Sequence, residues 1–405
     1  MSLWRNADFR NLWLAQSVSL VGTQVTLLAF PLAALLLGGS ALEVSLLAAV
    51  EFVPVLLLGL PVGAWVERLP LRPVLIASDL IRAGALAVVP LAYVMDMLTM
   101  PLLYGVAFLI GLATLFFDVA HLSWLPDLVT EEQLTDGNAK LETSRSLSQL
   151  AGPGLGGGLV QVLSAPVAIA LDSLTYLASA LFLTRIGKPS RPPQPTGEGG
   201  LGRQIGEGLR FVAGHRLLRP LMLSAAAAEL AFAAVLALQV VYAVQVLHLS
   251  AGVIGLALAV GNAGGLIGAL LAGKAVERYG PGPVIVGSIA LFAAGAAMLP
   301  MSGEVVLFGG GLFVVYLGVV LFNVVQVTLC QTATPPGLLG RMNATFRFVT
   351  WGMVPLGAAL GGLLVAPLGL RGVLWVAAAI TALSIVPPVM SAVRTLRAYP
   401  EGVTV

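Results

Sequence analysis

Two glutamates lie deep inside long apolar stretches, where a charged group needs a chemical reason. Glu51 lies in such a stretch in the first half of the chain, and Glu229 lies in one in the second half. A charge at the centre of a membrane costs about 2.5–3.5 kcal/mol on insertion scales. Because burial favours the neutral form of a carboxyl group, each glutamate could exchange a proton. Each could instead bind a cationic substrate or act as a hydrogen-bonded packing acid. Because each half has one such carboxylate, Glu51 and Glu229 are the first candidates for binding a proton or a cationic substrate.

Further charged residues fall within apolar stretches but closer to one membrane surface. Asp118, Arg82 and Arg145 are expected at similar depths in the cytoplasmic third of their spans. An Asp–Arg pair there would reduce the insertion cost, either as a permanent ion pair or as one that opens during gating. Asp172 and Arg347 are expected to line a gate or a cavity.

Histidine and cysteine usage gives no sign of a metal or a cofactor. The three histidines, His121, His215 and His248, are too few and too scattered for a His-rich centre. The single cysteine, Cys330, excludes a disulfide framework and a cysteine-based zinc site. We therefore expect no metal and no cofactor, and we interpret His121 as a plain interfacial residue.

The composition is that of a membrane protein. Of the 405 residues, 58% are apolar and 10% are charged, whereas soluble domains carry about 25% charged residues. Runs of about 20 apolar residues, long enough to cross a bilayer, recur along the chain. The net charge of +2 is small, and we expect a lipid bilayer and no nucleic acid as partner.

Turn residues and charges divide the apolar sequence into twelve expected transmembrane helices. In the first half they cover about residues 10–38, 43–66, 73–95, 101–125, 139–163 and 165–186. In the second half they cover about residues 218–247, 250–275, 283–301, 304–332, 342–366 and 371–396. The predicted domains are therefore a six-helix bundle over 1–187, a linker over 188–217 and a second six-helix bundle over 218–405. The linker opens with a Pro/Gly/Ser-rich segment and continues as a short amphipathic helix suited to a membrane interface.

The distribution of positive charge predicts the orientation. With the N-terminus in the cytoplasm, every Lys and Arg except Arg371 falls on or near the cytoplasmic side. Basic residues in short loops set the topology of a membrane protein, so both ends of the chain are expected in the cytoplasm. Trp124, Trp351 and Trp375 fit anchors at the membrane surface.

The two halves of the sequence contain matching residues at nearly constant spacings. Asn138 and Ala139 match Asn343 and Ala344, and the Gly-Gly pair at 156–157 matches that at 361–362, each 205 residues further along. At a spacing of 210 residues, Val66-Glu67-Arg68 matches Val276-Glu277-Arg278. Spacings this similar indicate one duplicated helical unit. Two related halves around a shared site are typical of many transporters.

The repeated segment resembles the loop between helices 2 and 3 of the major facilitator superfamily. That pattern has a Gly, an acid four residues later, an Arg and further basic residues. The matching positions are Gly63, Glu67, Arg68 and Arg72 in the first half, and Gly273, Glu277 and Arg278 in the second. The glycines are expected to permit close helix packing. The resemblance implies that the acid–Arg pairs lock one conformation of the transporter and release it in another. A solvated cluster of loop charges is the alternative for either copy alone.

A second segment resembles a signature of the superfamily's proton-coupled exporters. Gly152, Pro153, Gly156 and Gly157 fit its Gly-Pro and Gly-Gly pattern. The proline would kink the helix, and the small residues would let a neighbouring helix approach. A Gly-rich packing helix without an exporter role is the alternative. The opening segment from Asn6 to Gln16 and the segment from Ile76 to Arg82 resemble the macrolide-efflux and siderophore-exporter branch of the superfamily. Members of that branch often carry an acid in the middle of helix 1. This chain has Gly22, Thr23 and Gln24 there, so that proton site cannot be carried over.

The resemblance implies an all-α membrane protein with twelve transmembrane helices in two pseudo-symmetric bundles. The function expected is secondary active export of amphipathic small molecules, such as drugs or metabolites, coupled to protons by alternating access. An importer or an uncoupled facilitator on the same fold is the alternative. The chain lacks Gly-x-Ser-x-Gly, His-Glu-x-x-His and the nucleotide-binding Gly-x-x-x-x-Gly-Lys-Ser/Thr motif, so neither an enzyme nor an ATP-driven pump is expected. We expect a monomer in the cytoplasmic membrane.

Overall fold

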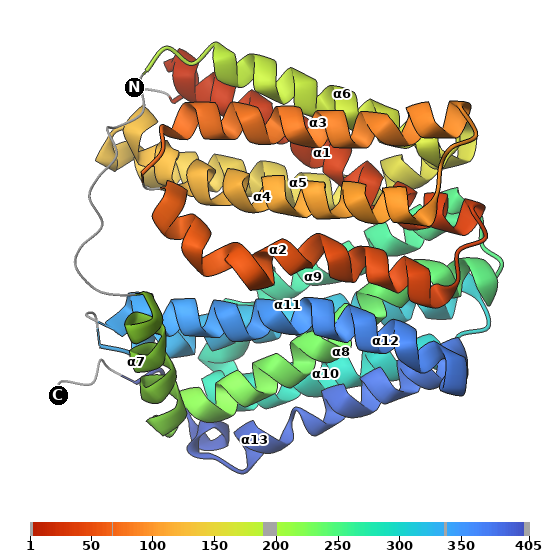
Figure 1. Cartoon of the computed structure of the whole chain (residues 1–405). Helices are drawn as coiled ribbons and strands as arrows, with labels where there is room; N and C mark the ends of the chain where they lie inside the picture. The colour runs from red at the N-terminus through yellow and green to blue at the C-terminus, as the bar shows by residue number, and fades with distance from the viewer. Residues whose placement is uncertain (1–2, 67, 189–200, 336–337, 401–405) are drawn as a thin grey trace. The chain divides into compact units, whose positions relative to one another are not determined.

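The computed structural model describes residues 3–66, 68–188, 201–335 and 338–400, and in these ranges every regular element is a helix (Figure 1). The first half contains η1 (Leu3–Arg5), α1 (Ala7–Leu36), α2 (Ala41–Val66), α3 (Leu71–Val94), α4 (Met100–Leu128), α5 (Glu131–Leu163) and α6 (Ala165–Thr184). The second half contains α7 (Leu201–Gly214), α8 (Leu218–Gln245), α9 (Ala251–Tyr279), α10 (Pro281–Met301), α11 (Val305–Thr332), α12 (Leu339–Leu383), α13 (Val386–Val389) and η3 (Ala392–Thr395).

Local chemistry explains where several helices begin. The side chain of Asn6 accepts hydrogen bonds from the backbone N–H groups of Asp8 (3.0 Å) and Phe9 (3.2 Å), which caps α1. Helices α4, α6 and α10 each have a proline in the first turn, where its missing N–H costs nothing. Gly38 (φ 76°) and Gly280 (φ 84°) form the turns before α2 and α10, in a left-handed conformation that favours glycine.

The helices correspond to the twelve expected spans. Ten of the described helices are long and apolar enough to cross a membrane. The Gly-, Ser- and Gln-rich α5 is less apolar and falls outside these ten. The 45-residue α12 contains a break at Gly369 (φ 69°, ψ 167°) and so supplies two spans. Its second segment ends at Leu383 rather than near residue 396 as expected, and the short α13 and η3 follow.

The chain folds into two compact units. Unit 1 comprises Met1–Glu198 together with Ser250–Ala259, and unit 2 comprises Gly199–Leu249 and Val260–Val405. The first turns of α9 therefore belong to unit 1 and the rest of that helix to unit 2. Most of the Pro/Gly/Ser-rich segment of the expected linker lies outside the described residues.

In unit 1, α1 packs against α5 and α6, α3 packs against α4 and α6, and α2 packs against α4. Trp124 is 0% exposed in the core of this unit, and His121 is also buried, with its ring stacked on Phe117. The interfacial positions expected for Trp124 and His121 are therefore wrong. Both residues share one face of α4 with Phe117, and that face is turned into the protein.

In unit 2, α8 packs against α12, and α10 packs against α11 and α12. Helix α7 lies against α12 and α8 (Figure 1). At Gly208 an added Cβ atom would lie 2.8 Å from the carbonyl oxygen of Arg341 in α12. Val212 is fully buried in the core of the unit. The buried residues of α7 thus contact protein.

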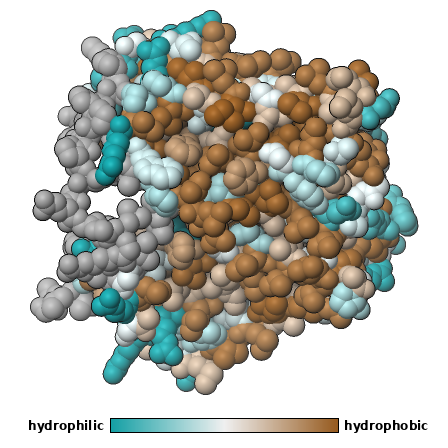
Figure 2. Space-filling model, viewed as in Figure 1, coloured by the Kyte–Doolittle hydropathy of each residue, from teal (hydrophilic) through white to brown (hydrophobic). Residues whose placement is uncertain are grey.

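Figure 2 shows a largely apolar face, with hydrophilic residues toward its margins. Large apolar side chains on many of the helices are exposed, among them Leu57 (65%), Leu91 (62%) and Leu270 (70%). In a chain whose helices can span a bilayer, such side chains are positioned to contact lipid.

Candidate functional site

Unit 2 contains a cavity of about 510 Å³ between α8, α10, α11 and α12. Two of the charged residues singled out in the sequence, Glu229 and Arg347, line it from α8 and α12. Other residues that line the cavity are Phe232, Phe292, Phe322, Asn323, Gln326, Cys330, Asn343, Phe346, Thr350 and Trp351. Aromatic rings and amide groups thus share the walls with one acid and one base.

Glu229 is half-buried in the cavity wall. The described residues offer its carboxyl group no hydrogen bond and no ion pair. A buried charge without a partner is costly, and a proton or a positively charged ligand would relieve that cost. Glu229 is therefore a group that can bind either one within the cavity.

Arg347 is held differently. Its guanidinium carbon lies 4.4 Å from the centroid of the ring of Trp351, which is one helical turn further along α12. This cation–π interaction orients the Arg347 side chain. Trp351, which the sequence suggested as a surface anchor, lines the cavity and carries this contact. The cavity therefore presents a positive group opposite in sign to Glu229.

The remaining walls are aromatic and amide-rich. Phe232 makes edge-to-face contacts with Phe292 (5.9 Å between centroids) and Tyr316 (5.6 Å). Gln326 donates a hydrogen bond to the sulfur of Cys330 (3.1 Å). Apolar walls with a few fixed polar groups are typical of small-molecule sites, and this combination suits an amphipathic ligand.

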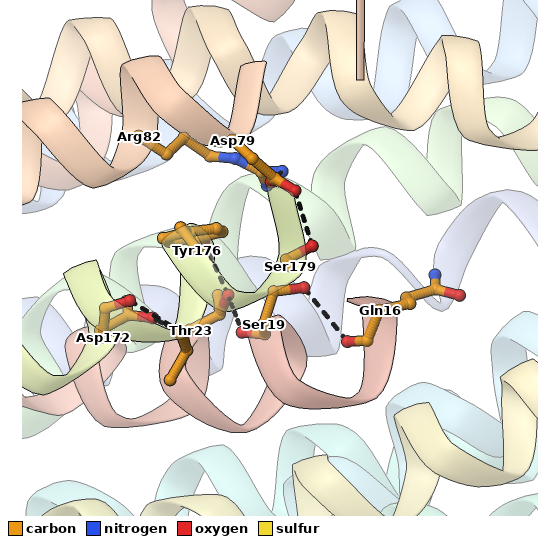
Figure 3. A network of polar contacts seen from close by, with 9 residues as sticks. Gln16, Ser19, Thr23, Asp79, Arg82, Asp172, Tyr176 and Ser179 are labelled. Carbon is orange, nitrogen blue, oxygen red and sulfur yellow. Dashed lines mark hydrogen bonds and ion pairs between the residues drawn. The ribbon is translucent and has the colours of Figure 1, made fainter. Parts of the chain in front are cut away.

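Unit 1 contains a buried polar network at the junction of α1, α3 and α6 (Figure 3). Asp79 and Arg82, one turn apart on α3, form an ion pair, and Ser179 of α6 donates a hydrogen bond to Asp79 (2.6 Å). The guanidinium of Arg82 lies between two rings, 4.2 Å from the centroid of Phe117 and 4.3 Å from that of Tyr176. These contacts offset the cost of placing the charge of Arg82 inside a membrane span.

The network continues onto α1. The hydroxyl groups of Tyr176 and Thr23 are 2.8 Å apart, and Thr23 donates to the carbonyl oxygen of Ser19 (2.8 Å). Asp172 of α6 accepts hydrogen bonds from Thr26 (2.5 Å) and Thr175 (2.8 Å). Asp172 is thus tied to both α1 and its own helix.

Gly22 makes room for Asp172. A Cβ atom at Gly22 would overlap with the side chains of Asp172 and Thr175. The acid from α6 therefore occupies the space beside the middle of α1. Two groups in this region, Asp79 and Tyr176, were not singled out in the sequence. The spacing of three between Asp79 and Arg82 was the available signal for the first.

The other expected site residues of unit 1 lie on α2, α4 and α5. Glu51 is half-buried on α2, and its backbone carbonyl packs against Gly111 of α4. Asp118 is exposed on α4 and acts electrostatically on Arg82, although the ion pair of Arg82 is formed with Asp79. Arg145 is exposed on α5 and acts electrostatically on His121.

The structure brings the loop residues of the repeated motif into different surroundings. Glu67 lies outside the described residues, and the surroundings of Gly63 do as well. Arg68 is exposed, and Arg72 donates a hydrogen bond to the carbonyl oxygen of Thr184 (2.5 Å) at the end of α6.

In the second copy of the motif, Glu277 and Arg278 are exposed, and the guanidinium of Arg278 lies 5.5 Å from the ring centroid of Tyr279. Gly273 has no described atom within 4 Å of an added Cβ, so the close packing expected there is absent. Gly264 and Gly268, further from the end of α9, do pack closely, against the backbone of Phe313 and of Leu317 in α11.

The glycines of the expected exporter motif do pack closely. Added Cβ atoms at Gly152 and Gly156 would meet α1 at Gln24 and Val25. Gly157 lies against the first turns of α9, where its Cβ would be 2.9 Å from the Cα atom of Gly255. The motif proline, Pro153, lies inside α5. In unit 2, Gly361 of α12 packs in the same way on Ala234 of α8.

No group of three or more His, Cys, Asp or Glu side chains that could hold a metal ion occurs in the described part of the chain.

Comparison with known proteins agrees with this architecture. The family model of the Major Facilitator Superfamily matches residues 12–354 and 221–404. Macrolide efflux protein A of Streptococcus pyogenes is 25% identical to this chain over 96% of the chain and 97% of its own length. Multidrug efflux pump Tap of Mycolicibacterium fortuitum is 30% identical over 49% of the chain and 51% of its own length. A bacterial homologue of the iron transporter ferroportin, solved in an inward-facing state, shares the fold with a TM-score of 0.78 at 18% identity, over 96% of this chain and 99% of that one. The chain therefore belongs to the major facilitator superfamily and is a multi-pass membrane transporter.

Proposed function

We propose that this transporter is a secondary active exporter of amphipathic small molecules and that it couples export to protons. The observation that carries the proposal is Glu229, a carboxylate without a described partner in a cavity of aromatic and amide groups. The similarity to a macrolide efflux protein and a multidrug efflux pump supports export. The substrate expected from this lining is an apolar molecule with a positively charged group.

Proton coupling follows from competition for one carboxylate. A proton and a cationic substrate both neutralise Glu229, so binding of one disfavours binding of the other. If protons bind from outside and substrate binds from the cytoplasm, this exclusion couples proton entry to export. Glu51 and Asp172 are the further acids proposed to carry protons in unit 1. If Glu51 and Asp172 do not carry the proton, the proposed proton site is Asp118 with Arg145 and Arg82. Arg347 would orient the acidic or polar end of the ligand.

The loop and glycine motifs are proposed to control the exchange between conformations. Arg68, Glu277 and Arg278 lie in the two copies of the loop motif, and Gly152 and Gly156 allow α5 to pack tightly on α1. In this proposal the loops set the balance between inward-facing and outward-facing states, and the substrate does not contact them. The protein would work as a monomer in the cytoplasmic membrane, with both ends of the chain in the cytoplasm.

Transport into everted membrane vesicles tests this proposal. With an inside-acid pH gradient, vesicles containing the protein should accumulate cationic fluorescent dyes against their concentration gradient. Glu229→Gln should abolish this uphill accumulation but retain downhill exchange, because the cavity remains and only the titratable group is lost. Glu304→Gln, the same change at an exposed position outside the cavity, is the matched control and should transport normally.

The same assay separates the alternative functions. Equilibration of the dye without uphill accumulation, at a rate that does not depend on the pH gradient, would favour an uncoupled facilitator. Uptake into right-side-out vesicles would favour an importer. If Glu229→Gln, Glu51→Gln, Asp172→Asn and Asp118→Asn each retain full uphill transport, coupling through these carboxylates is wrong.

A further inference from the structure

A second hollow of unit 2 lies at its surface, where α7 meets α8 and where α13 and η3 pack beside them. Its volume is about 570 Å³. The residues that line it are Ala213, Gly214, His215, Arg216, Arg219, Pro220, Leu223, Val386, Pro387, Met390, Ser391 and Ala392. We call this hollow the α7–α8 groove. It shares no lining residue with the cavity that contains Glu229.

One edge of the α7–α8 groove is basic. Arg216 and Arg219 lie three residues apart and both are exposed. The described residues provide neither guanidinium group with a hydrogen bond or an ion pair, and no Asp or Glu is among the described residues that line the groove. Two guanidinium groups that line one hollow, with no acid among its described lining residues, form a site for an anion with several oxygens.

Another part of the lining, the apolar edge, is exposed to the surroundings of the protein. Met390 is 82% exposed, Leu223 is 49% exposed and Val386 is 41% exposed. The apolar span of α8 begins at Leu218. Arg216 lies just before it, Arg219 lies in its first turn and Leu223 lies in its second turn. The groove therefore passes from charged to apolar at the end of a membrane span.

The junction that shapes the groove is held by His215. Its Nδ1 atom accepts hydrogen bonds from the backbone N–H groups of Leu217 (3.2 Å) and Leu218 (3.3 Å). An imidazole that accepts at Nδ1 is neutral, and partial burial lowers the pKa of His215 in agreement with this. The arginines are thus presented from a capped helix start rather than from a loose loop.

We propose that the α7–α8 groove binds an anionic phospholipid, with the phosphate headgroup between Arg216 and Arg219 and an acyl chain along Leu223, Val386 and Met390. The basic edge selects negative charge, and a bilayer supplies anionic headgroups at this depth. A free phosphate ion would use the two arginines equally well but would leave the apolar edge without a function. That edge is the reason to assign the site to a lipid. The lipid binds here as a structural partner and is separate from the transported substrate.

Lipid binding can be measured on the full-length protein in a neutral detergent. The midpoint of thermal unfolding is recorded while phosphatidylglycerol, phosphatidylcholine or inorganic phosphate is titrated in, and native mass spectrometry counts the bound lipids. Phosphatidylglycerol should raise the midpoint with saturation, and the other two should not. The double variant Arg216→Gln, Arg219→Gln should bind phosphatidylglycerol about tenfold to thirtyfold more weakly, because each basic residue near a lipid surface contributes about 1 kcal/mol.

A matched control removes the same charge elsewhere. Lys188→Gln with Arg210→Gln neutralises two exposed basic residues that do not line the groove, and it should bind phosphatidylglycerol as the wild type does. If the double arginine variant does not fold, the single variant Arg219→Gln and native mass spectrometry give the same comparison. Equal binding of phosphatidylglycerol and phosphatidylcholine, or unchanged binding in the arginine variants, would overturn the proposal. An equal effect of inorganic phosphate would assign the site to free phosphate instead.

Discussion

Two acid–base pairs in unit 1 have the same chemistry but very different surroundings. The side chains of Asp79 and Arg82 are 0% and 6% exposed, whereas those of Asp136 and Lys140 are 53% and 23% exposed. Removing one partner of a buried pair leaves the other charge uncompensated and costs about 3–5 kcal/mol. An exposed pair contributes only about 0–1 kcal/mol. We therefore expect Asp79→Asn to lower the free energy of unfolding by about 3–5 kcal/mol.

Asp136→Asn is the matched control and should lower the free energy of unfolding by less than about 1 kcal/mol. Chemical unfolding of the two purified variants in the same detergent measures the difference. Similar losses for both variants would show that burial does not set the strength of the Asp79–Arg82 pair.

At the scale of single residues, the sequence revealed which charged side chains lie in apolar segments, but it did not reveal all of their partners. The apolar surroundings of Glu229 and Arg347 were enough to select them, and both line one cavity. The expected partner of Arg82 was Asp118, which was placed at a similar depth, whereas the ion pair forms with Asp79, one turn away on the same helix. The approach of Asp172 to Gly22 could not be foreseen, because it depends on the register between α1 and α6. Sequence spacing fixes contacts within one helix and does not fix register between helices.

Between helices, small residues set how closely the backbones approach. An added Cβ atom at Gly357 of α12 would lie 2.9 Å from the Cβ atom of Ala233 and against the backbone of Leu230, both in α8. Gly287 of α10, by contrast, has no described atom within 4 Å of an added Cβ. Because a backbone cannot move aside as a flexible side chain can, α8 and α12 would have to separate.

We therefore expect Gly357→Ala to destabilise the protein by about 1–3 kcal/mol, as overpacking does. Gly287→Ala should instead be neutral or stabilising by up to about 1 kcal/mol, since alanine favours a helix over glycine. Thermal unfolding in detergent measures both changes. Because α8 and α12 also line the cavity, Gly357→Ala should in addition weaken substrate binding. A stable Gly357→Ala variant with normal transport would show that the close contact is not needed.

The repeats in the sequence predicted equivalent helices better than they predicted equivalent contacts. Gly156 and Gly361 are 205 residues apart. Gly156 packs on α1, and Gly361 packs on α8. Gly273 belongs to the other repeat but faces open space. A repeated glycine indicates an equivalent place in the two halves, and the side chains around it decide whether a neighbouring helix packs there.

For the whole molecule, hydropathy and turn residues were sufficient for the fold class. Apolar runs separated by Gly, Pro and charged residues gave the helices, because a backbone inside a bilayer must satisfy its hydrogen bonds internally. They did not reveal that α12 passes through Gly369 without a loop or that Trp124 is buried. They also could not show that the first turns of α9 belong to unit 1. These features depend on packing between segments that are distant in the chain.

The positions of the Lys and Arg residues predict how the whole molecule is oriented in the membrane. The chain contains 21 Lys and Arg residues, and with a cytoplasmic N-terminus only Arg371 falls on the outer side. Single cysteines at Ser190, in the polar stretch between the halves, and at Gly303, between α10 and α11, should therefore react from opposite sides of the membrane. The native Cys330 is buried, so Cys330→Ala removes it as a background with little change in charge or surface. In intact cells an impermeant maleimide should label Gly303→Cys and leave Ser190→Cys unreacted, and everted vesicles should show the reverse. Labelling of both positions from one side would contradict the twelve-span topology, and a complete reversal would place both ends of the chain outside.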